Sequence, residues 1–265
     1  MKGFLQALCP TDKSLKDFSA EVHYGSKVWD VPVLRFESYG GKAALKGSMN
    51  VKDSEPRYQV EGEFQGLDLG LFLSRQDLSS KVLEGTLRLK GSLSGTGWGP
   101  EAWSKSLTGQ GEFTLTNGKF LTFDLKDPLV TIEPFQGLGA IAPDLRDFES
   151  MNFQWKIAED RAKTDNLLVK ARDYVVDGEG TLGFDGLANF RADVFLSSVL
   201  AAKLLPKMAD AFEKNPKAHL GPVPALLSGP LMKPEVKVDP AQVSELTKRI
   251  RKGKAKEILC ELVLE

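Results

Sequence analysis

The sequence predicts a mainly β fold: a curved antiparallel sheet, either a β-groove or a sandwich-like meander, with a few short covering helices and a C-terminal helix. Apolar and polar residues alternate in several runs, turn residues separate these runs, and helical spacing is rare. Successive side chains of a strand point to opposite faces, so each run has one apolar face and one wet face, as in antiparallel sheets. The clearest runs are residues 58–64, 87–93, 113–116 and 151–157.

Turn residues punctuate these runs at short intervals and predict hairpins, and therefore a meander. They are Tyr39-Gly40-Gly41, Asn117-Gly118, Glu159-Asp160-Arg161 and Phe184-Asp185-Gly186. A type I′ turn needs positive φ at both central residues, and Arg161 resists that conformation. We therefore expect a turn of another type between residues 158 and 162.

Helical segments are few. Gly99-Pro100-Glu101 predicts a short helix to about Leu107, because proline is favoured in the first turn. One or two helical turns are expected over residues 124–130. Residues 198–214 have apolar positions at helical spacing, with Pro206 expected to kink or divide the helix.

The chain is expected to divide into a β-rich region, residues 1–238, and a C-terminal amphipathic helix or tail, residues 239–265. A loose strand–turn–strand repeat suggests two related β modules, about 16–95 and 96–238. The final segment begins at Asp239-Pro240, an N-cap followed by proline, and runs into a Lys/Arg-rich stretch. It reads either as a basic helix on an anionic membrane or, as the following glutamates favour, as a solvated tail.

Composition excludes several function classes. The 265 residues are 42% apolar and 27% charged, as in folded domains, and their net charge of −1 makes a nucleic-acid partner unexpected. No run of about 18 apolar residues is present, so no bilayer span is predicted. The short apolar start is unlike a signal segment, and we expect the sequence to be the end of a longer chain whose targeting segment precedes Met1.

Two motifs raise enzymatic hypotheses that their context disfavours. Gly91-Ser92-Leu93-Ser94-Gly95 matches G-x-S-x-G, but a strand runs through it, which leaves an esterase with Ser92 or Ser94 as a remote alternative. Gly178-x-Gly180-x-x-Gly183 matches the dinucleotide fingerprint, but the alternation continues through it where a helix is required. The two histidines, His23 and His219, form no cluster with cysteine. We expect no enzyme, no catalytic residue, no metal and no cofactor.

Four stretches, in order, resemble the C-terminal region of the AsmA-like family of bacterial envelope proteins. The first is a small helix, an S-L-x-G-x-G entry and a strand ending in Asn-Gly; the second resembles an F-x-x-L strand. The third is a strand pair with v-x-G-x-G-x-l, and the fourth is a closing segment with spaced glycine and proline. They occupy residues 95–120, 148–157, 165–182 and 223–239, and the motif positions are Gly178, Gly180, Gly229 and Pro234.

This resemblance implies a non-enzymatic periplasmic protein, held in the inner membrane by an N-terminal helix outside this sequence. The implied role is phospholipid transport to the outer membrane, or homeostasis of that membrane, through an apolar β surface. The implied ligand is phospholipid or another acyl chain. The alternative is an assembly scaffold for outer-membrane or other envelope proteins, which would bind through sheet-edge or helix contacts.

The apolar strand faces permit two interpretations. They are either an ordinary core or a trough open to acyl chains, and alternation serves both equally. Gly178 and Gly180 permit close backbone approach or bending of the sheet. The candidate lipid-facing residues are Phe113, Leu115, Phe153, Trp155, Ile157 and Val169.

Overall fold

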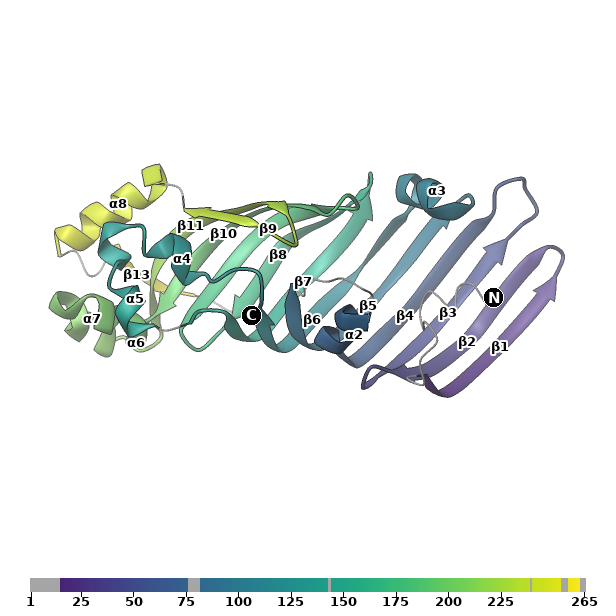
Figure 1. The fold of residues 1–265 in the computed structure, drawn as a ribbon, viewed down its shortest axis with the longest axis horizontal. Helices are drawn as coiled ribbons and strands as arrows, with labels where there is room; N and C mark the ends of the chain where they lie inside the picture. Colours follow the sequence, from purple (N-terminus) through teal and green to yellow (C-terminus); the bar gives the residue numbers. More distant parts are fainter. Residues whose placement is uncertain (1–14, 76–81, 143, 239, 254–256, 263–265) are drawn as a thin grey trace.

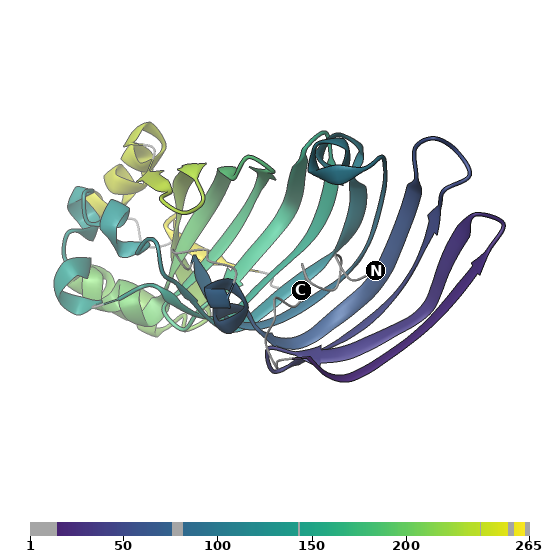
Figure 2. The same cartoon turned by 45° about the vertical axis from the view of Figure 1, so that its right-hand side comes forward.

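A computed structural model describes residues 15–75, 82–142, 144–238, 240–253 and 257–262. It confirms the predicted fold class, with 57% strand, 21% helix and one open antiparallel sheet of 13 strands (Figure 1). The sheet is twisted and curved rather than flat (Figure 2). A sandwich needs two packed sheets, so the single sheet is not the sandwich-like alternative.

The strands follow one another in chain order across the sheet, each antiparallel to its neighbour, from β1 to β12, while β13 pairs with β11. This order requires only short local connections, as the turn signals predicted. The strands are β1 (Lys16–Gly25), β2 (Val28–Ser38), β3 (Gly41–Asn50), β4 (Arg57–Asp68), β5 (Leu83–Thr96), β6 (Thr108–Phe120), β7 (Asp147–Ala158), β8 (Arg161–Lys170), β9 (Tyr174–Gly183), β10 (Leu187–Ser197), β11 (Ala218–Pro230), β12 (Glu235–Val238) and β13 (Leu259–Glu261).

The turn between β7 and β8 corrects one expectation. Glu159 and Asp160 are its two central residues, with φ of 52° and 60°, and Ala158 pairs with Arg161. Positive φ at both central residues is the signature of the type I′ turn that we had excluded. The error was one of register, because Arg161 is the first residue of β8 and never needs positive φ.

A second correction concerns Asn117-Gly118, which we expected to be a turn at the end of a strand. Both residues lie inside β6, where Asn117 has φ of 51° and the pairing with β5 shifts in register opposite Gly85. An extra residue in one strand of an antiparallel pair is a β-bulge, which bends and twists the sheet locally. Asn117 therefore curves the sheet instead of ending the strand.

The helices occupy some of the connections. They are α2 (Leu69–Arg75), α3 (Gly99–Ser106), α4 (Lys126–Leu129), the 3-10 helix η1 (Glu133–Phe135), α5 (Leu138–Ile141), α6 (Ser198–Leu204), the 3-10 helix η2 (Pro206–Met208), α7 (Ala209–Glu213) and α8 (Pro240–Arg251). Pro206 divides the segment 198–214 as predicted, and α3 has the predicted bounds to within one residue. The helix α2 was not predicted from the sequence. In Figure 1, α4 to α8 gather beside β9–β11.

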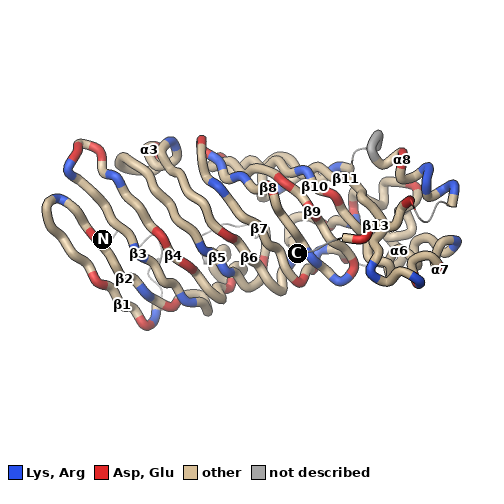
Figure 3. Tube along the Cα trace, turned by 180° about the vertical axis from the view of Figure 1, so that it is seen from behind, with Lys and Arg blue, Asp and Glu red and all other residues tan. Residues whose placement is uncertain are grey.

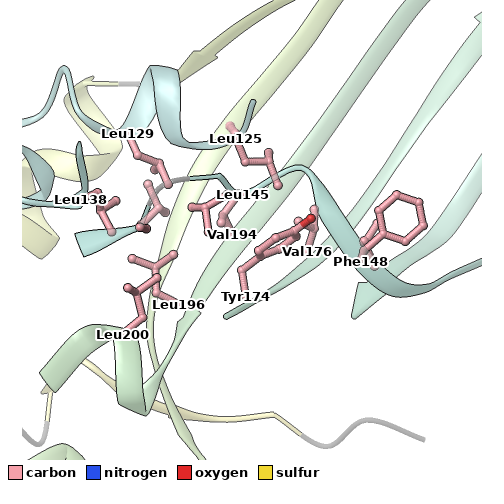
Figure 4. Close-up of a cluster of buried hydrophobic side chains, with 14 of the residues drawn as sticks. Leu125, Leu129, Leu138, Leu145, Phe148, Tyr174, Val176, Val194, Leu196 and Leu200 are labelled. Carbon is pink, nitrogen blue, oxygen red and sulfur yellow. The ribbon is translucent and has the colours of Figure 1, made fainter. Parts of the chain in front are cut away.

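The core lies on one face of the sheet, toward the strand ends that carry α2 and α4–α7. A row of register-paired residues crosses this face, and each is at most 8% exposed. We call it the sealed row: Leu87, Leu115, Met151, Val169, Val176, Val194 and Val223. Figure 4 shows Leu125, Leu129 and Leu138 of the 121–146 connection against Val176, Val194 and Tyr174 of the sheet. This packing makes the connection a lid.

Asp124 holds that connection in place. It is buried, its Oδ1 accepts hydrogen bonds from the backbone N–H of Lys126 (2.9 Å) and Leu145 (3.2 Å), and Arg146 Nε lies 3.8 Å from Oδ2. Buried carboxylates are tolerated only when they are paired in this way. The lid is therefore fixed at both ends.

The C-terminal segment packs on the same core. Val243 and Leu246 of α8 are buried, so the apolar side of this helix is occupied by the domain. The chain then adds β13, which the predicted tail did not include. Asp239 and residues 254–256 of the basic run lie outside the described residues. No helix within the described residues combines the length and hydrophobicity needed to cross a bilayer.

The predicted division near residue 95 falls at the end of β5. That strand pairs with both β4 and β6, so the sheet is continuous across this position. The modules 16–95 and 96–238 therefore share one sheet.

Candidate functional site

The candidate site is the part of the apolar face that the helices leave partly exposed. Along β7, Met151 is buried in the sealed row, whereas Phe153, Trp155 and Ile157 on the same face are partly exposed. The same gradient follows β5 and β6, away from the helix-covered end. We call this region the open strip: Val60, Phe64, Leu89, Leu93, Phe113, Phe153, Trp155 and Ile157.

The structure separates the six candidate lipid-facing residues into two groups. Leu115 is 0% exposed and Val169 is 2% exposed, so both belong to the closed core and neither can meet a ligand in this conformation. Phe113, Phe153, Trp155 and Ile157 lie in the open strip. The alternation could not separate the two groups, because all six share one face.

Glycines lower the floor of the open strip. Gly62, Gly91 and Gly111 are aligned by register on β4, β5 and β6, and Trp155 is the next residue along this line on β7. A Cβ at Gly91 or at Gly111 would lie 2.5 Å from Cζ2 of Trp155, far inside van der Waals contact. The indole therefore lies over the bare backbone of two strands, an arrangement that compensates for glycine in a sheet.

Aromatic rings border this floor on the core side. Phe113 and Phe153 are stacked, with ring centroids 4.5 Å apart and planes 15° apart, and Phe36 meets Phe64 edge-on at 6.3 Å. Val60, Leu93 and Ile157 border the other side. The strip is therefore a shallow apolar surface that crosses the strands.

Sequence reasoning missed the glycine floor and the β4 and β5 members of the strip. A signal was present, since Gly62 and Gly91 occupy apolar-phase positions in the runs 58–64 and 87–93. A glycine in that phase removes a side chain from the apolar face only. Comparing the phase of neighbouring runs would have identified the set.

The motif glycines behave as expected for close approach. A Cβ at Gly180 would lie 2.4 Å from the Phe190 ring, and one at Gly178 would lie 2.7 Å from the Arg191 carbonyl oxygen. Gly229 has φ of +91°, which favours glycine, and Pro234 precedes the short strand β12. These positions shape the sheet and contribute no functional group.

The opposite face is wet and electrically neutralised. Cross-strand pairs join Lys42 to Glu37 (3.0 Å), Lys46 to Glu61 (3.2 Å) and Arg88 to Glu63 (2.6 Å). The hydrogen bond from Arg88 lowers the pKa of Glu63. Basic and acidic positions are interspersed along the strands in Figure 3.

Two hollows are present on this wet face. The first is lined by Arg35, Lys46, Glu61, Lys90 and Glu112 among others, and the second by Asp177, Arg191, Asp193 and Pro224 among others. Burial, and secondarily the charge of Asp177, raises the pKa of Asp193. Charges of both signs balance in the first hollow, whereas the second has an acidic excess, with Asp165 and Glu179 beside Asp177 and Asp193 against the single Arg191.

The two enzyme-like motifs do not lie in the structural context that their chemistry requires. Ser94 Oγ lies 3.0 Å from Thr108 Oγ1, while His219 lies on β11, six strands or about 29 Å away across the sheet. The Gly178–Gly183 motif lies within β9 and leads into strand β10, not into a helix. In the described part of the chain no group of His, Cys, Asp and Glu could hold a metal ion. The absence of enzymatic activity stays a prediction.

No family model, no curated protein and no solved structure matches the chain. The AsmA-like resemblance therefore depends on the four sequence stretches alone. Any function must be argued from those stretches and from the geometry of the sheet.

Proposed function

We propose that this chain is a non-enzymatic region of an envelope protein that holds phospholipid acyl chains on its open strip. In this proposal it acts in phospholipid transport to the outer membrane or in homeostasis of that membrane. The compartment is the periplasm, with anchorage to the inner membrane through a segment outside this sequence. Both the role and the compartment come from the AsmA-like resemblance.

The observation that carries the proposal is the open strip. Its side chains continue the apolar face beyond the sealed row but remain partly exposed, and the Trp155 indole lies over the aligned glycines at their centre. Contiguous exposed apolar surface of this kind marks a binding site more often than a random surface. Nothing ionic is required for an acyl chain, which fits the scarcity of polar groups on this face.

Burial of an acyl chain on this surface can give measurable affinity without a deep pocket. Each buried CH₂ contributes about 0.8 kcal/mol, so eight of them contribute roughly 6 kcal/mol before the costs of association. Such binding is reversible, as transport requires.

Native mass spectrometry and binding of a fluorescent fatty acid, both without vesicles, test the proposal. Ile157→Asp places a charge in the open strip and should reduce acyl binding at least about tenfold. Gln154→Asp, on the wet face of the same strand, is the matched control and should bind as the unsubstituted chain does. Equal binding by both variants, or no binding by the unsubstituted chain, refutes the proposal.

A second candidate function, an assembly scaffold, is favoured by β1. All ten residues of this strand are exposed, and within the described residues it pairs only with β2. The other edge of the sheet differs, because β12 and β13 both cover β11. A bare edge strand is a template for strand addition by a partner.

Site-specific photo-crosslinking distinguishes the scaffold from the lipid carrier. A crosslinker at Ser19 of β1 should capture an envelope protein if the edge is a docking strand, and one at Glu235 of β12 should not. Absence of protein adducts at Ser19 in cells removes this candidate.

A further inference from the structure

Exposed aromatic and large apolar side chains collect at one end of the strands. This end contains the connections 26–27, 51–56, 97–107, 159–160, 184–186 and 231–234. Trp98 is 66% exposed and Tyr24 is 61% exposed, and three of the four tryptophans of the chain lie here. We call this set the free rim: Tyr24, Trp29, Trp98, Trp103, Phe184 and Leu187, all exposed.

At the other end of the strands, most aromatic residues are buried. Tyr39, Phe120, Phe148 and Tyr174 lie at or near that end, and each is at most 7% exposed. Helices and long connections cover these residues. Phe18 on the edge strand β1 is an exception at 46% exposed, so aromatic exposure is concentrated at the free rim without being confined to it.

The free rim is continuous with the apolar face. Trp29 pairs with Met49, which pairs with Tyr58, and the rings of Tyr24 and Trp29 lie 4.6 Å apart. Trp103 of α3 meets Tyr58 edge-on, with centroids 6.2 Å apart. Tyr58 is on the same face of β4 as Val60 of the open strip. A continuous set of apolar contacts therefore leads from the rim onto the strip.

The length of the free rim favours an extended partner. Its members extend from β1 to β10, nine strand intervals or about 43 Å, and the connections lie along one long side of the molecule (Figure 1). A protein interface concentrates its affinity in a compact, well-packed centre. A line of separated anchors instead matches an extended surface such as that of a bilayer.

The chemistry of the free rim matches the interfacial region of a bilayer. Tryptophan and tyrosine combine an apolar ring with a polar atom and concentrate where membranes meet water. The connections 26–27, 51–56, 97–107, 159–160, 184–186 and 231–234 include four Lys and six Asp or Glu. This small acidic excess gives no net attraction to anionic lipid, so the expected surface is zwitterionic.

We propose that the free rim docks this protein on the surface of a zwitterionic phospholipid bilayer, with the rings of Trp98, Trp103 and Phe184 in the headgroup region. This inference does not depend on acyl binding by the open strip. The continuity of the two surfaces would let a lipid pass from the bilayer onto the sheet.

Flotation with phosphatidylcholine vesicles tests the inference. Trp98→Ser combined with Phe184→Ser should reduce vesicle binding at least about tenfold, since each ring loses buried apolar area. Leu71→Ser combined with Val199→Ser is the matched control, because both residues are similarly exposed but lie at the other end of the strands. This control should float within about twofold of the unsubstituted chain.

Quenching by brominated phosphatidylcholine supplies a direct readout. Quenching should be strong in the unsubstituted chain and should fall in Trp98→Ser, with circular dichroism unchanged. Failure of the unsubstituted chain to float overturns the inference, as does equal flotation of the rim variant. In a further outcome, sedimentation shows that the rim substitutions change self-association although the unsubstituted chain does not bind vesicles. The rim is then a protein interface and the inference is wrong. Vesicle-free fatty-acid binding is scored separately, so the two proposals can fail independently.

Discussion

The sealed row and the open strip lie on the same face of the same sheet, yet only one of them is closed. Leu115 and Phe113 are two residues apart on β6, and the first is fully buried while the second is partly exposed. The difference comes from the connections. Those at the helix-covered end include residues 69–82, 121–146 and 198–217, whereas those at the free end are at most 11 residues long. Alternation decides which face is apolar, and connection length decides what covers it.

The largest effect on stability is expected when a charged side chain is placed in the sealed row and, for comparison, in the open strip. Leu115→Asp should unfold the domain, with a loss above about 4 kcal/mol, because an unpaired carboxylate is then buried. Ile157→Asp should cost about 1 kcal/mol or less, because the open strip admits water. Urea denaturation followed by circular dichroism measures both. Equal losses would mean that the strip is as closed as the core.

The next effect concerns the helices that cover the core. Phe212→Ala in α7 removes a fully buried ring and should cost about 3–5 kcal/mol. Phe184→Ala in the free rim removes an exposed ring and should cost about 0.5 kcal/mol or less. Thermal unfolding compares them. A large loss at Phe184 would show that the rim contributes to folding.

A smaller effect is expected inside the strip. Gly91→Ala introduces a Cβ where the Trp155 indole lies and should cost about 1–3 kcal/mol. In a Trp155→Ala background the same substitution should cost less, because the indole is gone and the Gln110 carbonyl oxygen, 2.6 Å from the added Cβ, is the remaining close atom. A double-mutant cycle measures the difference, and additivity would show that the indole does not lie over Gly91.

The smallest effect depends on pH. Burial raises the pKa of Asp193, so folding favours its protonated form. The stability associated with that form is fully present below the unfolded pKa and is lost as pH rises through the folded value. Asp193→Asn should therefore stabilise the domain at pH 7 by about 0.5 kcal/mol, since the site is partly exposed, and the gain should vanish near pH 3. Urea midpoints at the two pH values test this sign.

Sequence alone identified the fold class and the apolar phase of each strand, because both follow from a period of two. It could not separate Leu115 and Val169 from Trp155 and Ile157, because burial depends on distant connections such as 121–146. It missed α2, whose seven residues are too few for a periodic signal. Asp68, whose Oδ1 accepts from the backbone N–H of Leu71 at 2.8 Å, was the available sign of a helix start.

Strict chain order across the sheet has a consequence for the size of the apolar surface. From β1 to β11 every strand hydrogen-bonds to its immediate neighbours in sequence, and among the described strands only β13 returns to an earlier one. An architecture with nearest-neighbour contacts is nearly one-dimensional, so its units can be counted and changed singly. Inserting or deleting one hairpin would lengthen or shorten the sheet by about 10 Å and leave the remaining pairings intact. Duplication of a hairpin within the gene can therefore change the length of the apolar surface in steps of two strands.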